Sequence, residues 1–168
     1  GEIKPDLFFK ALIDFGNIDK FEIHIATKIH NYNVPKQLAH VVKKIEFMDY
    51  FKSIEYMSKM DCNLLILPYS GERKGVYSGK VFDYISSQRP ILGLLDTSDV
   101  AAQLINQFNI GYLAESNNAQ QIKTRILELY NDWQNNNIKT VDFESIKSLH
   151  RCEQVNILKK FLLEMVEQ

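Results

Sequence analysis

The segment from Ser70 to Lys80 is the part of the sequence best suited to hold a ligand. It follows the apolar run NLLILP and precedes the amphipathic run VFDYISS, so it connects a predicted buried strand to a predicted helix. Three of the seven glycines of the chain lie in this segment, and glycine lets the backbone approach a ligand closely. Ser78, Gly79 and Lys80 open the helix, whose first N–H groups and positive dipole end favour an anion. These features predict a phosphate site, with a solvent-exposed loop as the alternative interpretation.

Other catalytic and metal-binding patterns are missing from the sequence. The segment contains neither GxGxxG nor GxxxxGK[ST], which sets aside the dinucleotide and Walker-type sites. Cys62 and Cys152 form no CxxC or CxxH motif, and the four histidines have no metal-ligand spacing on one helix face. The chain also has no D-x-D sequence and no paired carboxylates at ligand spacing. We therefore expect no metal and no other cofactor, with lysines and helix N-termini neutralising a bound phosphate.

The elements that must position this segment alternate between strand and helix. Short apolar or β-branched runs alternate with amphipathic stretches, the order expected of βαβ units around an open parallel sheet. The predicted fold is therefore α/β and Rossmann-like, with helices flanking the sheet. Ser98 is the expected N-cap of the helix that follows the fourth strand. The predicted strands are 21–27, 44–47, 63–68, 90–95 and 110–114, and the predicted helices are 7–15, 35–42, 51–60, 78–87 and 98–108.

The last third of the chain has a different pattern. From Ala119 onward no strand is predicted, and two long helical patterns follow. The second carries an apolar stripe from Phe143 to Met165 that is interrupted at Arg151 to Gln154. This stripe is longer than the core of one sheet requires. We expect part of it to form an exposed apolar patch that favours self-association.

Composition excludes several classes of protein. The 168 residues are 45% hydrophobic and 24% charged, which is typical of one soluble globular domain. Twenty basic residues against twenty-one acidic ones give a net charge of −1 with no basic stripe, so nucleic acid is not an expected partner. No apolar run is long enough to span a bilayer, and no signal-peptide pattern is present. Two unpaired cysteines fit a reducing, cytoplasmic location.

The sequence also resembles a known enzyme family. The run YSGKVFDYISSQRPILGLL, continued by DVAAQLINQFNIGYLAES, is similar to the C-terminal, nucleotide-sugar-binding domain of GT-B-fold glycosyltransferases of the group 1, family 4 type. The stretches KIEFMDYFKSIEYMSKMDCNLLIL and GEIKPDLFFKAL resemble earlier parts of that domain, so the similarity covers nearly the whole chain. The resemblance implies a single donor-binding domain over 1–168, with the N-terminal acceptor domain and the first strand missing.

The resemblance implies a role for individual residues of this chain. Asp83 corresponds to the acidic residue that holds the donor ribose, and an ionised carboxylate can accept two hydrogen bonds from a vicinal diol. Ser78 and Gly79 would lie against the diphosphate, with Lys80 close by. The other donor-binding candidates are Phe47 and Met48, which would receive the base through main-chain contacts, and Lys28 and Lys4, which would stabilise the departing diphosphate.

The sequence departs from the family pattern at the acidic residue that contacts the transferred sugar. Many retaining members have a second acid eight residues before the ribose-binding one, but this position is Gly75 here. Glu72 is the nearest acid upstream and the candidate sugar contact, with a solvated loop tip as the alternative. The first acid is therefore replaced, shifted by an insertion or absent, and Asp83 is itself one methylene shorter than the usual Glu. The catalytic residues, the sugar and the stereochemical outcome stay open.

The resemblance further implies a donor and an acceptor. The donor would be a nucleotide-diphosphate sugar, UDP- or GDP-linked, and the acceptor a glycan or lipid-linked acceptor in polysaccharide biosynthesis. Sugar transfer by these 168 residues alone is not expected, because the acceptor side would come from the N-terminal domain. The expected location is cytoplasmic, with a peripheral position at the inner membrane face for the longer protein. The alternative is a non-catalytic Rossmann-like module that binds a nucleotide or a protein.

Overall fold

The computed structural model describes residues 5–27, 33–68, 75 and 77–166, and within them the chain is a mixed α/β structure with parallel strands. One sheet pairs β1 (Ile23–Ala26) with β2 (Val42–Ile45), and the other has the order β3 (Asn63–Ile66), β4 (Ile91–Leu95), β5 (Gly111–Glu115). All these pairs are parallel, as the alternating sequence pattern predicts. The expected single sheet is thus two separately hydrogen-bonded sheets among the described residues.

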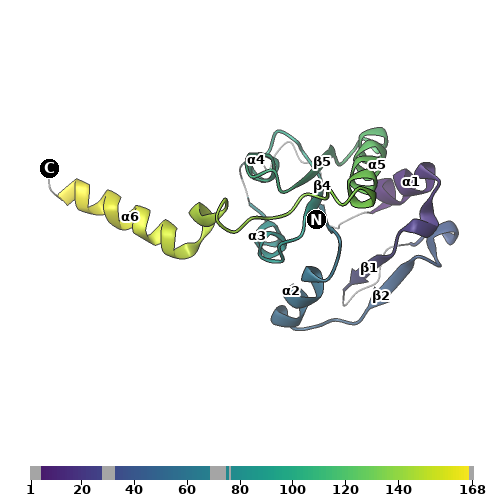
Figure 1. Ribbon diagram of the computed structural model, residues 1–168, viewed down its shortest axis with the longest axis horizontal. Coiled ribbons are helices and arrows are strands. Elements are labelled where there is room, and N and C mark those ends of the chain that lie inside the picture. Colours follow the sequence, from purple (N-terminus) through teal and green to yellow (C-terminus); the bar gives the residue numbers. More distant parts are fainter. Residues whose placement is uncertain (1–4, 28–32, 69–74, 76, 167–168) are drawn as a thin grey trace.

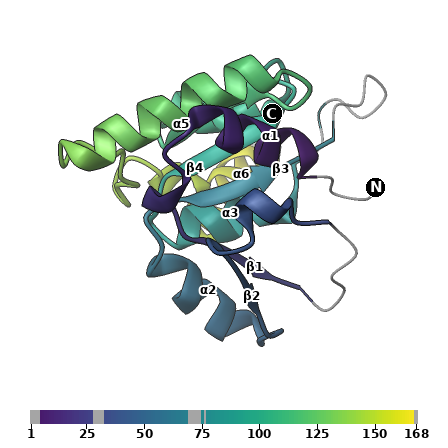
Figure 2. The same ribbon diagram turned by 90° about the vertical axis from the view of Figure 1, so that its right-hand side faces the viewer.

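The larger sheet is the middle of three layers (Figure 2). Helices α3 (Gly79–Ser86) and α4 (Val100–Gln107) pack on one face, and α1 (Asp6–Phe15) and α5 (Ala119–Gln134) pack on the other. Residues of β4 alternate between the two cores: Ile91 and Leu95 face α3 and α4, whereas Leu92 and Leu94 face α1 and α5. Every residue of β4 is buried, which explains why this strand reads as a continuous apolar run.

Helix α2 (Tyr50–Ser58) lies beside α3 and connects the two sheets (Figure 1). None of its residues is fully buried, so polar contacts take a large share in holding it. At its C-terminal end, Arg89 Nε donates to the carbonyl oxygen of Ser58 over 2.6 Å. On the side of the smaller sheet, the Tyr56 hydroxyl lies 2.6 Å from Nδ1 of His24. At its start Asp49 is the N-cap and accepts a hydrogen bond from the Lys52 amide.

The segment before β2 was predicted as a helix over 35–42, and this prediction is wrong. Only a three-residue 3-10 turn, η2 (Lys36–Leu38), forms there, and β2 begins at Val42. Val42 pairs with Ile23, and its β-branched side chain fits a strand better than a helix. The predicted strand 44–47 therefore lies two residues too late. Phe47 follows the strand instead of ending it, and Met48 comes directly after Phe47.

Helix α4 begins one residue later than the sequence suggests. Asp99, not Ser98, is its N-cap, and its carboxylate accepts the Val100 amide over 2.8 Å. Ser98 instead donates its amide and its hydroxyl to Asp96 in the preceding turn. A charged oxygen at the N-cap interacts more favourably with the helix dipole than a hydroxyl does.

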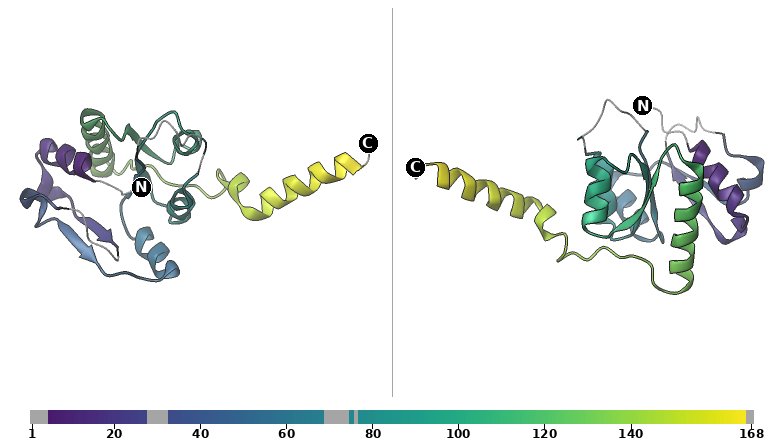
Figure 3. Two further views of the ribbon diagram at one scale, coloured as in Figure 1. Left: turned by 180° about the vertical axis from the view of Figure 1, so that it is seen from behind. Right: turned by 90° about the horizontal axis from the view of Figure 1, so that it is seen from above.

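The final apolar stripe is not one helix. Val141 and Ile146 pack into the core beside α3 and α4, and a 3-10 turn, η3 (Lys147–Leu149), follows. His150 is extended, and α6 (Arg151–Val166) begins immediately after it. The break therefore precedes Arg151, and residues 151–154 belong to the first turn of α6. This helix extends away from the layered domain (Figure 3).

Candidate functional site

The carboxyl ends of β3, β4 and β5 meet at one edge of the larger sheet, where helices α3, α4 and α5 begin. Ligands of open parallel sheets bind at this edge, because helix N-termini direct unpaired N–H groups toward it. Three of the six donor-site residues that the structure describes belong to the start of α3: Ser78, Gly79 and Lys80.

Ser78 is the N-cap of α3, and its side chain makes no capping hydrogen bond. Its carbonyl accepts the Val81 amide over 3.0 Å, so the amides before Val81 are not used by the first turn of the helix. Lys80 is exposed, and a Cβ placed on Gly79 would meet no other atom within 4 Å. The helix start is therefore open, positively polarised and accessible to an anion.

A hydrogen bond links the turn before α3 to the N-cap residue of α4. The amide of Gly75 donates to the Asp99 carboxylate over 2.9 Å, and the same oxygen caps α4. Gly75 has a φ of +85°, a conformation that residues with a side chain rarely adopt. Asp99 thus links the turn before α3 to the start of α4. No local pattern in the sequence indicates this link between two loops.

Asp83 lies one turn into α3, three residues after Lys80 and four after Gly79, so all three share one side of the helix. Its carboxylate is partly buried, and Oδ1 accepts a hydrogen bond from the Tyr50 hydroxyl over 2.9 Å. Tyr50 is the first residue of α2. It comes two residues after Met48 and three after Phe47.

The structure therefore brings the Phe47–Met48 segment close to Asp83 through Tyr50, although 33 residues separate Tyr50 from Asp83. Phe47 is exposed, and Met48 is partly buried. Nothing in the sequence pattern around Tyr50 indicates a contact with α3. Three other candidate residues, Lys4, Lys28 and Glu72, lie outside the described residues.

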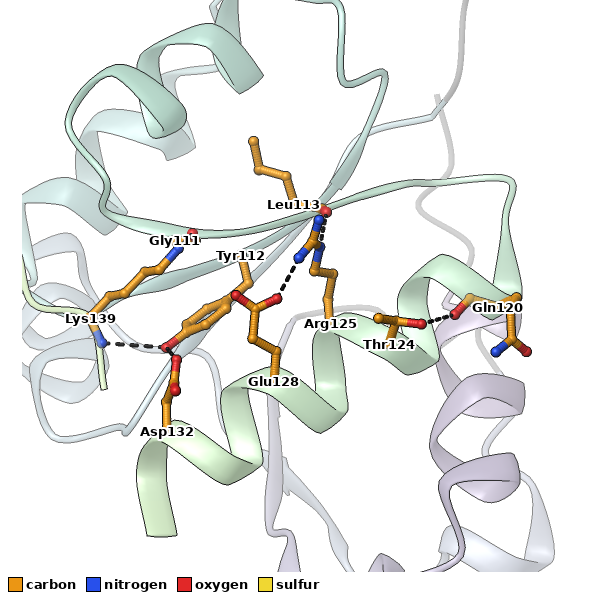
Figure 4. A network of polar contacts seen from close by, with 9 residues as sticks. All are labelled: Gly111, Tyr112, Leu113, Gln120, Thr124, Arg125, Glu128, Asp132 and Lys139. Carbon is orange, nitrogen blue, oxygen red and sulfur yellow. Dashed lines mark hydrogen bonds and ion pairs between the residues drawn. The ribbon is translucent and has the colours of Figure 1, made fainter. Parts of the chain in front are cut away.

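A second polar region lies along the outer edge of β5 (Figure 4). Lys139 Nζ donates to the Gly111 carbonyl oxygen and Arg125 Nε to that of Leu113, each over 2.8 Å. Arg125 also pairs with Glu128. These cations occupy the carbonyl oxygens of an edge strand and so hinder pairing with another strand. A pocket of about 450 Å³ opens here and shares no residue with the start of α3.

Within the described part of the chain, no group of three or more His, Cys, Asp or Glu side chains could hold a metal ion. None of the described helices has the length and apolar character that crossing a bilayer requires. No family model, no curated protein sequence and no solved structure matches the chain significantly. Any functional conclusion must therefore be drawn from the residues themselves.

Proposed function

We propose that the chain is the nucleotide-sugar-binding domain of a GT-B-fold glycosyltransferase and supplies a sugar to a glycan or lipid-linked acceptor. The observation that carries this proposal is the pairing of an open α3 start, Ser78 to Lys80, with a carboxylate one helical turn away, Asp83. One turn spans about 5.4 Å. A nucleoside diphosphate carries its anionic diphosphate next to a ribose diol, in the same order.

The proposed contacts divide between charge and hydrogen bonding. The amides at the start of α3 and the Lys80 ammonium would bind the diphosphate, where the helix dipole favours negative charge. The Asp83 carboxylate would accept hydrogen bonds from the ribose hydroxyls, which a base or a phosphate alone does not offer. The exposed segment at Phe47 and Met48 would receive the base through its main chain.

Isothermal titration calorimetry with UDP and with GDP tests the proposal. Asp83→Ala should weaken binding by about 1.5 to 3 kcal/mol, the range for a hydrogen bond to a charged group. Asp61→Ala is the matched control, because Asp61 is an exposed acid in the turn before β3. Asp61→Ala should leave the affinity unchanged.

Two results would refute the proposal. Equal affinity of the unaltered chain and Asp83→Ala would remove Asp83 from the site. Absence of binding to either nucleotide would favour the alternative of a module that binds another ligand.

Binding should not depend on a divalent metal. Affinity measured in a chelator should equal that measured with magnesium or manganese, because the amides and Lys80 neutralise the diphosphate directly. Binding that disappears in the chelator and returns with either metal would contradict this prediction.

A further inference from the structure

The hydrogen bond from Tyr50 to Asp83 joins two helices at the centre of the proposed site. The Tyr50 hydroxyl donates to Oδ1 of Asp83 over 2.9 Å, from the first turn of α2 to the second turn of α3. Tyr50 is 58% exposed, so burial of the ring contributes only part of what holds it there. Its ring packs edge-on against Phe51, with the centroids 5.6 Å apart.

Helix α2 presents Tyr50 from a fixed position. The Arg89 contact to the Ser58 carbonyl holds the far end of α2, where the helix dipole favours a cation. The contact between Tyr56 and His24 holds its C-terminal half against the smaller sheet. The Asp49 cap fixes the turn that carries Tyr50. The hydroxyl therefore reaches Asp83 from a helix that is anchored at separate points.

A carboxylate on a helix surface can rotate about its side-chain bonds, and a ligand must pay for the loss of that freedom. An ionised carboxylate offers about four lone-pair positions on two oxygens. A single hydroxyl on Oδ1 limits the rotation of the group. It occupies one acceptor position and leaves the others to the hydroxyl donors of a ligand.

We propose that Tyr50 is a positioning residue, whose hydroxyl orients the Asp83 carboxylate toward the ribose diol of a nucleoside diphosphate. This inference rests on the proposed function and adds to it a residue from a different helix. The Asp83 carboxylate, through its hydrogen bond and its charge, raises the pKa of Tyr50, and the charge of Arg151 at the start of α6 opposes this effect. Tyr50 therefore remains a neutral donor near neutral pH.

The test compares Tyr50→Phe with Tyr130→Phe. Each variant removes one tyrosine hydroxyl, but the Tyr130 hydroxyl lies on α5, where it accepts a hydrogen bond from Gln134. The ligands are UDP and 2′,3′-dideoxyuridine diphosphate, which lacks the diol. Tyr50→Phe should weaken UDP binding about threefold to tenfold, the effect of one hydrogen bond. It should leave binding of the dideoxy ligand unchanged, and Tyr130→Phe should affect neither ligand.

A titration of tyrosine absorbance against pH tests the pair without any ligand. Asp83→Asn removes a charge that raises the pKa of both Tyr50 and Tyr84, so both pKa values should fall. When the same substitution is made in Tyr50→Phe, only the fall in the pKa of Tyr84 should remain.

The outcomes separate the two proposals. If UDP binds and Asp83→Asn weakens it, while Tyr50→Phe does not, the positioning role is wrong and the proposed function stands. An equal loss of affinity for UDP and the dideoxy ligand in Tyr50→Phe would show a merely structural role and also overturn the inference. If the unaltered chain binds neither UDP nor GDP, the proposed function fails and this inference fails with it.

Discussion

Asn63 and Ser87 form a polar pair inside the apolar domain. The Asn63 amide donates to Ser87 Oγ over 2.8 Å, and that hydroxyl donates to the Tyr84 carbonyl over 2.6 Å. Both residues are buried, and their hydrogen bond links the start of β3 to the end of α3. Since α3 carries the proposed donor site, this pair contributes to holding the site on the sheet.

Ser87→Ala should lower the free energy of unfolding by about 1 to 3 kcal/mol, because the buried Asn63 amide loses its acceptor. Ser86→Ala is the matched control, since its exposed hydroxyl only donates to the Phe82 carbonyl within the helix. We expect a change within about 0.5 kcal/mol for the control. Urea denaturation measures both, and equal midpoints for the two variants would contradict the prediction.

The Cys62 thiol makes stability sensitive to alkaline pH. Burial raises its pKa from 9.0 to about 12. Between these values the unfolded chain releases a proton that the folded chain keeps, so the free energy of unfolding falls as pH rises. The contribution of the protonated thiol to the free energy of unfolding is complete below pH 9.0 and is lost toward pH 12. This contribution falls by at most about 1.4 kcal/mol per pH unit.

Cys62→Ala should therefore show a smaller decline in unfolding free energy between neutral and alkaline pH than the unaltered chain. Cys152→Ala is the control, because Cys152 is exposed on α6. Urea denaturation at several pH values measures both. If the two variants have the same pH profile, the thiol of Cys62 is not responsible for the decline.

At the scale of elements, close packing of β4 and β5 depends on Gly111. A Cβ added there would lie 2.2 Å from the Ile91 carbonyl oxygen and 3.0 Å from a methyl group of Ile105. The first neighbour is backbone of the paired strand, which cannot move without disturbing the sheet. This position accepts only glycine because of the space around it.

Gly111→Ala should therefore lower the free energy of unfolding by about 3 kcal/mol, the upper range for overpacking in a core. Gly79→Ala is the comparison, since a Cβ there meets no atom within 4 Å and alanine favours a helix. We expect Gly79→Ala to change stability by less than about 1 kcal/mol. Thermal unfolding of the two variants side by side measures this, and similar midpoints would mean that β5 shifts to admit the methyl group.

At the scale of the whole molecule, α6 is an apolar helix outside the layered domain. Its apolar side chains are between 51% and 84% exposed, and no residue of α6 is buried. This confirms the expected exposed patch on the last part of the stripe. The members of the patch are Val155, Ile157, Leu158, Phe161, Leu162, Leu163, Met165 and Val166.

An apolar patch of this size should make the 168-residue chain associate with itself as concentration rises. Leu158→Lys combined with Leu162→Lys places two charges on one side of α6 and should restore the monomer. Asn156→Lys adds a charge without removing apolar surface and should leave the association unchanged. Sedimentation velocity over a range of concentrations measures the oligomeric state. A monomer at every concentration would show that the patch does not mediate self-association.

Local sequence patterns determined the layered α/β core. The buried runs at β3, β4 and β5 and the apolar faces of α1, α3, α4 and α5 were all predicted, because burial imposes a period on each element. The start of α3 was also predicted, because an N-cap and a glycine mark it in the sequence. The short segment 35–42 was not, because Leu38, Val41 and Val42 suit either a turn of helix or a strand until pairing with β1 decides.

Contacts between distant residues were decided only by the tertiary structure. Tyr50 meets Asp83, Gly75 meets Asp99 and Arg89 meets Ser58 across separations of 33, 24 and 31 residues. Each contact depends on how two elements pack, and nothing in the sequence near either residue indicates it. The break before α6 has the same origin, because burial of Ile146 in the core fixes where the chain leaves the domain. The sequence thus determined which elements form, and their packing determined which side chains meet.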